Sequence, residues 1–152
     1  MADAYLVALT MLSRRELSEA QIRTRLARKE FEDDEIETAV EQLRRDGTIN
    51  DRRVALAAAR LESTIRHRGR ARVIQKLRSL GIDGDVIESA VNEVFEEVDE
   101  GALLDRAFER RLRGKAPKDL DERGRARVVR GLAGQGFSIA AILKRLKGTP
   151  DR

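Results

Sequence analysis

The hexapeptide Arg-Gly-Arg-Ala-Arg-Val occurs twice in this chain of 152 residues, at positions 68–73 and 123–128. At the same offset of 55 residues, further glycine and apolar positions coincide, and at an offset of 51 the first third of the chain aligns with the second. The matched pairs include Ile22 with Val73, Leu26 with Leu77, Leu77 with Leu132, and Gly81 with Gly136. Repeats of this length are typical of helical arrays in which each repeat forms one supersecondary unit. We therefore predict three units, at residues 1–49, 50–100 and 101–152.

The apolar spacing within each unit predicts three helices. In the second unit, Asn50 or Asp51 can cap a helix whose inward positions follow i, i+3, i+4, i+7 and i+11: Val54, Ala57, Ala58, Leu61 and Ile65. Gly69 and Gly81 then bracket a short helix that buries Val73, Leu77 and Leu80. A third helix over 83–98 is capped by Asp83 and turns Ile87, Ala90, Val91 and Val94 inward.

The first and third units follow the same plan with local differences. Ser18 and Gln21 have the spacing of a capping box. Ser18 and Glu30 occupy positions that are glycine in the other units, so we expect different turn geometry or some strain there. In the third unit, apolar positions at 104–112, 128–132 and 138–146 mark the helices, and the polar stretch 114–122 is the loosest joint.

Composition agrees with a wholly helical chain. Charged residues make up 38% of the sequence and aromatic residues 3%, there are two prolines, and no segment alternates as a half-buried strand does. A unit of this size buries little apolar surface alone, so neighbouring units should pack together. The prediction is an all-α fold of three tandem three-helix repeats, helix-turn-helix-like units stacked into an elongated, curved array.

Features that would indicate catalysis, a cofactor or a membrane anchor are missing from the sequence. There is no cysteine, no apolar run of 18 residues and no basic, apolar leader at the N-terminus, so we expect a cytoplasmic protein. His67 lies between two arginines and reads as a solvated helix-end residue rather than a metal ligand. The acidic runs 30–37 and 96–100 fit helix ends better than metal sites. We predict no enzymatic activity, no metal and no cofactor.

Positive charge is concentrated toward the C-terminus. The net charge is −3 over residues 1–49, −1 over 50–100 and +8 over 101–152. The candidate binding residues lie around the duplicated hexapeptide and near the C-terminus: Arg66, Arg68, Arg70, Arg72, Lys76, Arg123, Arg125, Arg127, Arg130 and Lys144. Solvated arginines are the simpler interpretation of any one position. The duplicated pattern favours a ladder of cationic sites for phosphate or for an acidic protein groove, and the residue types do not separate the two.

With these features described, the sequence resembles the RecX family of regulators of the RecA recombinase. The resemblance rests on Asp46-Gly47-Thr48-Ile49-Asn50-Asp51-Arg52-Arg53-Val54-Ala55, on Arg66, Gly69, Val73, Leu77, Gly81 and Ile82, and on the opening Ala8-Leu9, Leu12 and Arg15-Glu16. Arg53 and Val54 stand where such proteins commonly carry an aromatic or bulky apolar residue.

The resemblance implies a cytoplasmic, largely monomeric modulator that binds in the groove of RecA–DNA filaments and inhibits the recombinase. Bare single- or double-stranded DNA should then bind weakly and in a salt-dependent way. An alternative is a direct DNA-binding protein of the helix-turn-helix type, because a short turn at 81–82 joins two helices. The acidic helix at 83–98 is poorly suited to reading bases, which disfavours that alternative.

Overall fold

The structure of this protein is a computed structural model that describes residues 3–148, in which every regular element is helical. The first group of helices is α1 (Ala4–Leu12), α2 (Glu19–Arg28) and α3 (Asp33–Arg45). The second is α4 (Asp51–Arg60), continued by the π-helical turn η1 (Leu61–Ile65), then α5 (Arg70–Ser79) and α6 (Gly84–Glu97). The third is α7 (Glu100–Leu112), the 3₁₀ turn η2 (Pro117–Asp119), α8 (Glu122–Gly134) and α9 (Ile139–Leu146).

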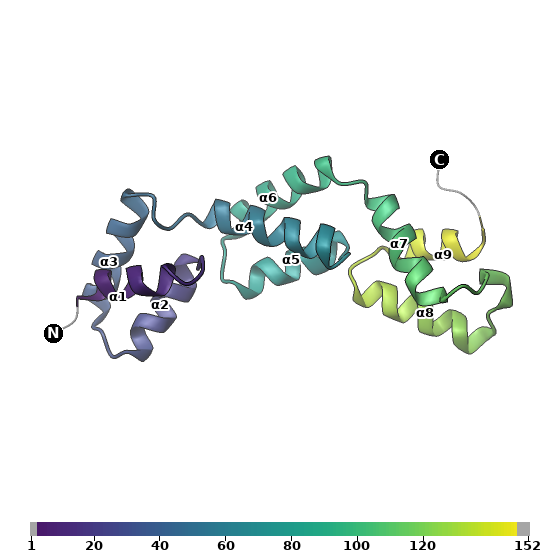
Figure 1. Cartoon of the computed structure of the whole chain (residues 1–152), viewed down its shortest axis with the longest axis horizontal. Helices are drawn as coiled ribbons and strands as arrows, with labels where there is room; N and C mark the ends of the chain where they lie inside the picture. Colours follow the sequence, from purple (N-terminus) through teal and green to yellow (C-terminus); the bar gives the residue numbers. More distant parts are fainter. Residues whose placement is uncertain (1–2, 149–152) are drawn as a thin grey trace.

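The three groups follow one another in a bowed row, with α1–α3 at one end and α7–α9 at the other (Figure 1). This confirms the predicted all-α, elongated and curved array of three-helix repeats, while the exact boundaries 1–49, 50–100 and 101–152 stay a prediction. Within residues 3–148, no helix is both long enough and apolar enough to span a bilayer.

Each group has its own apolar core. The most deeply buried side chains of the three cores are Ile22, Leu26, Val40 and Leu43 in the first, Val73, Leu77, Val91 and Val94 in the second, and Leu132 and Ile142 in the third. Leu77 and Leu132 are both fully buried, as their equivalent repeat positions predict. Phe95 and Val98 pack against both the second and the third core and so connect them.

Helix caps and turns largely follow the sequence. The Ser18 hydroxyl accepts a hydrogen bond from the Gln21 N–H, and the Gln21 side chain accepts one from the Ser18 N–H, which confirms the capping box. Asn50 caps α4 by accepting from the Arg53 N–H. Asp83 stands at the N-cap of α6 but makes no side-chain cap hydrogen bond. Glu30 adopts a left-handed φ of 65°, close to the 73° of Gly81, so the first unit keeps the turn geometry and accepts its strain.

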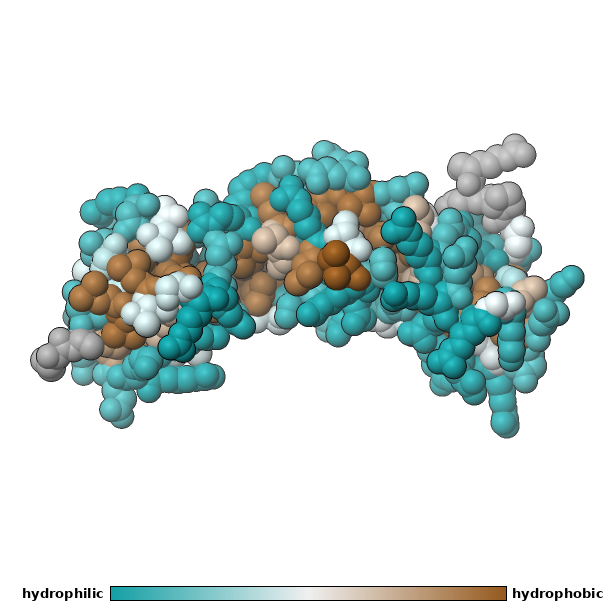
Figure 2. All heavy atoms as spheres, in the orientation of Figure 1, coloured by the Kyte–Doolittle hydropathy of each residue, from teal (hydrophilic) through white to brown (hydrophobic). Residues whose placement is uncertain are grey.

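The predicted inward face of α4 is wrong beyond its first turn. Leu61 is 45% exposed and Ile65 is 67% exposed, and Figure 2 shows apolar atoms at the surface in the middle of the array. The buried edge is instead Ala55, Ala59 and Ser63, spaced by four residues. These small side chains allow close approach to α6, and the shift of the buried face is already present within α4, where Ala57 is exposed, before the π turn begins at Leu61.

The joints between successive groups repeat the same contact. At the first joint, the Ser18 hydroxyl at the start of α2 donates to the Leu80 carbonyl after α5, at 2.5 Å. At the second, the Gly69 N–H before α5 donates to the Gln135 carbonyl after α8, at 2.7 Å. The two donors, Ser18 and Gly69, are 51 residues apart in the sequence, and the two acceptors, Leu80 and Gln135, are 55 residues apart. These separations equal the two repeat offsets. Equivalent positions of adjacent units are therefore joined by a hydrogen bond to a backbone carbonyl at both joints.

Arg53 adds a further link between the first and second groups. Its guanidinium pairs with Glu16 and donates to the Thr48 carbonyl at 3.0 Å. These contacts of Arg53 fix the connection between α3 and α4.

The two copies of the hexapeptide differ in structure at their first residues. Gly69 is extended and precedes α5, whereas Gly124 lies inside α8, whose N-cap Asp121 accepts from the Gly124 N–H at 2.7 Å. Gly69 contacts the third group at Gln135 and Gly136, whereas the neighbours of Gly124 are Asp121 and Leu120 of its own unit. Arg123 and Arg125 are consequently helical, whereas Arg68 lies in a loop.

Candidate functional site

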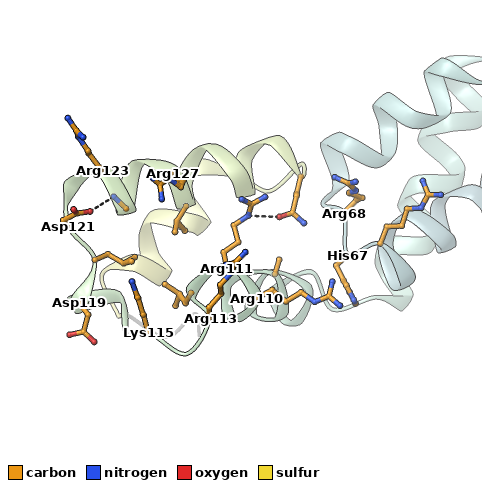
Figure 3. Close-up of a pocket in the computed structure, with 17 residues that line it drawn as sticks. His67, Arg68, Arg110, Arg111, Arg113, Lys115, Asp119, Asp121, Arg123 and Arg127 are labelled. Atoms are coloured by element: carbon orange, nitrogen blue, oxygen red, sulfur yellow. Dashed lines mark hydrogen bonds between the residues drawn. The ribbon is translucent and has the colours of Figure 1, made fainter.

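A cavity of about 1050 Å³ lies where the second and third groups meet; we refer to it as the junction cavity. The loop after η1 supplies Arg66, His67 and Arg68, the end of α7 supplies Arg110, Arg111 and Arg113, and Lys115, Arg123 and Arg127 come from the following loop and α8. Figure 3 shows these side chains on three separate walls, the arginines of α7 opposite those of α8. Its lining holds eight arginine and lysine side chains against two aspartates, Asp119 and Asp121.

Two left-handed turns shape the junction cavity. His67 has a φ of 54° in the loop that leaves η1, and the Arg68 N–H donates to the Glu62 carbonyl at 2.9 Å. At the end of α7, Arg113 and Gly114 both have positive φ, which stops the helix and reverses the chain toward η2. These turns bring cationic side chains from sequence-distant segments onto one concave surface.

Some of the cations in the junction cavity are held in place. Arg66 pairs with the buried carboxylate of Glu62 at 2.9 Å. The Arg111 guanidinium donates from Nε to the Gln135 side chain at 3.2 Å and lies against α8 at Gly131, where a Cβ would overlap it. Arg111 therefore bridges α7 and α8 with its guanidinium fixed across the cavity (Figure 3).

The other cations have no anionic partner within the described part of the chain. Side chains of Arg110, Arg113, Lys115, Arg123 and Arg127 make no ion pair with residues 3–148. Positive charges therefore outnumber negative ones in the cavity, and a concave positive potential results.

Two buried nitrogens at the cavity wall also have no hydrogen-bond partner, Nδ1 of His67 and Nε of Arg68. His67 does follow a helix, as expected, but it is half-buried rather than solvated, because the left-handed loop turns it toward the third group. Buried polar groups in proteins are nearly always hydrogen-bonded, so unpartnered ones at a cavity wall indicate an incomplete site.

The structure divides the ten predicted binding residues between two locations. Four of them line the junction cavity: Arg66, Arg68, Arg123 and Arg127. The remaining six lie outside it: Arg70, Arg72, Lys76, Arg125, Arg130 and Lys144.

The three residues of the first basic cluster that lie outside the cavity, Arg70, Arg72 and Lys76, differ in their contacts, although Arg72 and Lys76 are both exposed. Arg70 bonds the Asn92 side chain, and its guanidinium sits 5.7 Å from the centre of the Phe95 ring. Arg72 donates to the Gln75 side chain at 2.7 Å. These two arginines are therefore engaged within their own unit, while the side chain of Lys76 is exposed and points into solvent.

The end of α7 contributes cations to the cavity that the sequence repeat does not reveal. Arg110, Arg111, Arg113 and Lys115 lie outside the duplicated hexapeptide, so self-comparison gave them no weight. The available signal was the net charge of +8 in the last third of the chain, together with basic residues at a helix C-terminus. Their convergence with Arg66 and Arg68 depends on the joint between units, which spacing alone does not specify. Among residues 3–148, no three histidine, aspartate or glutamate side chains gather as metal ligands would.

Comparison with known proteins now places this geometry in a family. A family model described as the first three-helix domain of RecX matches residues 4–43. The Regulatory protein RecX of Syntrophotalea carbinolica is 37% identical over 143 residues, which cover 93% of each chain. The chain belongs to the RecX family. The Regulatory protein RecX of Pseudomonas entomophila is 33% identical over 146 residues, 93% of this chain and 88% of that one.

Solved structures agree on the fold. A crystal structure of a regulatory protein RecX superposes with a TM-score of 0.80 at 24% identity, over 95% of this chain and 70% of that one. RecX from Lactobacillus salivarius superposes with a TM-score of 0.75 at 22% identity, over 95% and 94% of the two chains. The array of three-helix repeats is thus the architecture of RecX-family regulators.

Proposed function

We propose that this RecX-family regulator works in the cytoplasm as a monomer, binding in the groove of RecA–DNA filaments and inhibiting the recombinase without catalysing a reaction. The observation that carries the proposal is the concentration of uncompensated positive charge on the second and third groups of a bowed array. RecA as the partner comes from the family resemblance, and the relatives' name, Regulatory protein RecX, supports a regulatory role.

Charge and shape together support a filament as the target. An elongated array can lie along a groove and touch several successive subunits, whereas a compact domain would touch one or two. The proposed contact residues are the ten cations identified from the sequence: Arg66, Arg68, Arg70, Arg72, Lys76, Arg123, Arg125, Arg127, Arg130 and Lys144. Guanidinium groups bind both phosphate and carboxylate in bidentate fashion, so a filament that offers DNA and acidic side chains suits them.

Direct reading of duplex DNA by a helix-turn-helix is the weaker alternative. In the second group, α6 would be the recognition helix, and its first half exposes Asp83, Asp85 and Glu88. Further along, Glu93 pairs with Arg52 at 2.6 Å, which ties α6 to α4. An acidic helix is repelled by phosphate, and α6 offers no arginine or lysine to guanine, so this chemistry disfavours base readout.

The deciding experiment measures RecA ATPase activity on single-stranded DNA while this protein is added below the RecA concentration. Substoichiometric inhibition is expected, because one bound regulator interrupts a filament of many subunits. Inhibition only at or above one molecule per RecA would instead indicate simple competition for DNA. ATPase activity that stays unchanged at every ratio would contradict the proposal.

A further inference from the structure

We propose that the junction cavity is a discrete binding site for a phosphate-bearing anion, either a stretch of nucleic-acid backbone or a free oligophosphate, held between the second and third groups. The proposal goes beyond the filament partner and does not depend on it, because the site is complete in this chain alone. It also differs from a diffuse cationic surface: it assigns binding to one concavity and to residues of α7 that lie outside the duplicated hexapeptide.

Positive charge dominates the lining of the junction cavity. Eight cationic side chains from three segments face one cavity, while the two aspartates at its η2 end and the buried Glu62, which pairs with Arg66, offset only part of that charge. Asp121 also caps α8, so part of its charge is already directed to the helix N-terminus. A concave surface lined by one sign of charge focuses its field and raises the local concentration of the opposite ion. An anion is therefore drawn into the cavity in preference to the open faces of the array.

The lining and the volume of the junction cavity indicate the chemical class of that anion. Arginine predominates over lysine in the lining, and its planar fork matches the paired oxygens of phosphate. The volume of about 1050 Å³ exceeds what a single phosphate needs and accommodates several linked phosphates. A phosphate group is tetrahedral and offers oxygens in several directions, so cations that converge from separate walls suit an oligophosphate or a phosphodiester backbone better than the planar carboxylates of an acidic peptide.

Two guanidinium groups of the junction cavity are already held in position before a ligand binds. Arg66 is held by Glu62, and Arg111 is held by Gln135 and by its contact with α8 at Gly131, so these guanidinium groups need little further ordering. Fixed donors bind more tightly because less side-chain entropy is lost on binding. Arg68 and His67 supply the unpartnered buried nitrogens at the same wall.

A ligand in the junction cavity would also reinforce the joint. One wall of the cavity belongs to the second group and two belong to the third. The two groups are also connected directly, by the hydrogen bond from the Gly69 N–H to the Gln135 carbonyl. An anion that contacts Arg68 and Arg113 together would bridge the units electrostatically. We therefore expect binding to raise the melting temperature of the chain.

The test uses calorimetric titration of the full chain with inorganic triphosphate and, separately, with a short oligothymidylate, at one fixed moderate salt concentration. The cavity variant is Arg110→Gln/Arg113→Gln/Arg127→Gln. The matched control is Arg78→Gln/Arg106→Gln/Lys118→Gln, which removes the same charge from exposed positions of the second and third groups that lie outside both the cavity and the proposed filament contacts. All six side chains are exposed, so both variants should fold, and circular dichroism verifies this.

The expected result is one ligand per chain for at least one probe, an affinity loss of roughly tenfold or more in the cavity variant, and little change in the control. Binding of triphosphate identifies free oligophosphate as a ligand, and binding of the oligonucleotide alone identifies the nucleic-acid backbone. Equal losses in the two triple variants would overturn the proposal in favour of diffuse charge, as would no binding of either probe. A glutamate-rich peptide that bound as tightly as triphosphate would overturn the assignment to phosphate. None of these outcomes involves RecA, so they are distinct from failure of the proposed function.

Discussion

Gly69 and Gly136 meet backbone to backbone across the joint between the second and third groups. A Cβ on Gly136 would lie 2.5 Å from the Arg72 nitrogen and 2.7 Å from the Gly69 carbonyl oxygen, and a Cβ on Gly69 would overlap the Gly136 carbonyl. Neither position has room for a side chain, because the obstructing atoms belong to the backbone. The two glycines are therefore required by contact between units, and Gly136 also by its φ of 100°.

Gly69→Ala should weaken this joint while leaving the three cores intact. The backbone of Gly69 is extended and suits alanine, so the cost arises from the contact with Gly136, at about 1–3 kcal/mol for an overpacked site. Small-angle scattering should show a changed maximum dimension, and thermal unfolding should begin earlier. Gly134→Ala is the control, since Gly134 is helical with nothing near its Cβ and should gain up to about 1 kcal/mol. A Gly69→Ala protein with unchanged scattering and melting would contradict the close contact.

Leu77→Ala and Leu132→Ala should each destabilise the chain by about 2–5 kcal/mol, because both leucines are fully buried in their cores. Ile65→Ala should change stability by less than about 0.5 kcal/mol, although the sequence pattern places Ile65 on a core face, because its side chain is 67% exposed. Chemical denaturation of the three variants checks both statements. A large loss of stability in Ile65→Ala would contradict the exposed position of the Ile65 side chain.

The contrast between Leu77 and Ile65 shows how far sequence reasoning extends. Leu77 was predictable because it recurs at two repeat offsets and lies on a regular helical stripe. Ile65 was not, since the buried face of α4 and η1 runs along the small side chains of Ala55, Ala59 and Ser63 and not along the larger apolar residues that mark the stripe in the sequence. The basic character of the candidate site was likewise predictable, from the net charge of the sequence. The shape of the site was not predictable, because Arg68 and Arg113 face the same cavity only through the joint between units.

Stability should fall in acid partly through Glu19. Hydrogen bonding to Arg44, at 2.7 Å, is the main cause that lowers the pKa of the Glu19 carboxyl in the folded state. A lowered folded-state pKa means that the contribution is complete above the unfolded value of about 4.3 and is lost as the pH falls through the folded value. Burial acts oppositely on the neighbouring Asp51 and raises its pKa, so that carboxyl favours the folded state at low pH.

The check is denaturation of the wild type and Glu19→Gln at pH 6 and pH 3. The variant should be less stable than the wild type at pH 6, and the difference should shrink at pH 3. Glu41→Gln serves as the control, because Glu41 pairs with Arg45 on an exposed surface. If the wild type and Glu19→Gln differed equally at both pH values, the ion pair with Arg44 would not be the cause.

Bare single-stranded DNA should bind weakly and with a steep dependence on salt. Phe108 and Phe137 are buried, and Phe31 and Phe95 are partly buried against the cores, so the described surface offers no aromatic platform for stacking bases. Binding then relies on phosphate contacts, which release counterions and weaken as salt rises. Fluorescence anisotropy between low and moderate salt measures the slope. An affinity that stayed constant over that range would show that stacking or base contacts contribute.

Charge reversal on the second and third groups should abolish recombinase inhibition without unfolding the chain. The two variants are Arg70→Glu/Arg72→Glu/Lys76→Glu and Arg125→Glu/Arg127→Glu/Arg130→Glu. In the first, Arg70 and Arg72 have partners only within their unit, so a small stability loss is expected there. In the second, all three side chains are exposed on α8 beside the buried Val128 and Leu132, and helical content should be unchanged.

If the filament presents phosphate and acidic side chains, each reversal removes an attraction and adds a repulsion, so these variants should act more strongly than the corresponding alanine variants. Reversal of Glu32, Asp33 and Asp34 is the matched control, because these carboxylates are exposed at the start of α3, far along the array from α8. The ATPase assay on single-stranded DNA reads out inhibition, and circular dichroism reads out folding. Should both basic variants fold and still inhibit RecA at wild-type concentrations, the cationic residues would only be solvated, and the binding surface would have to lie on the first group.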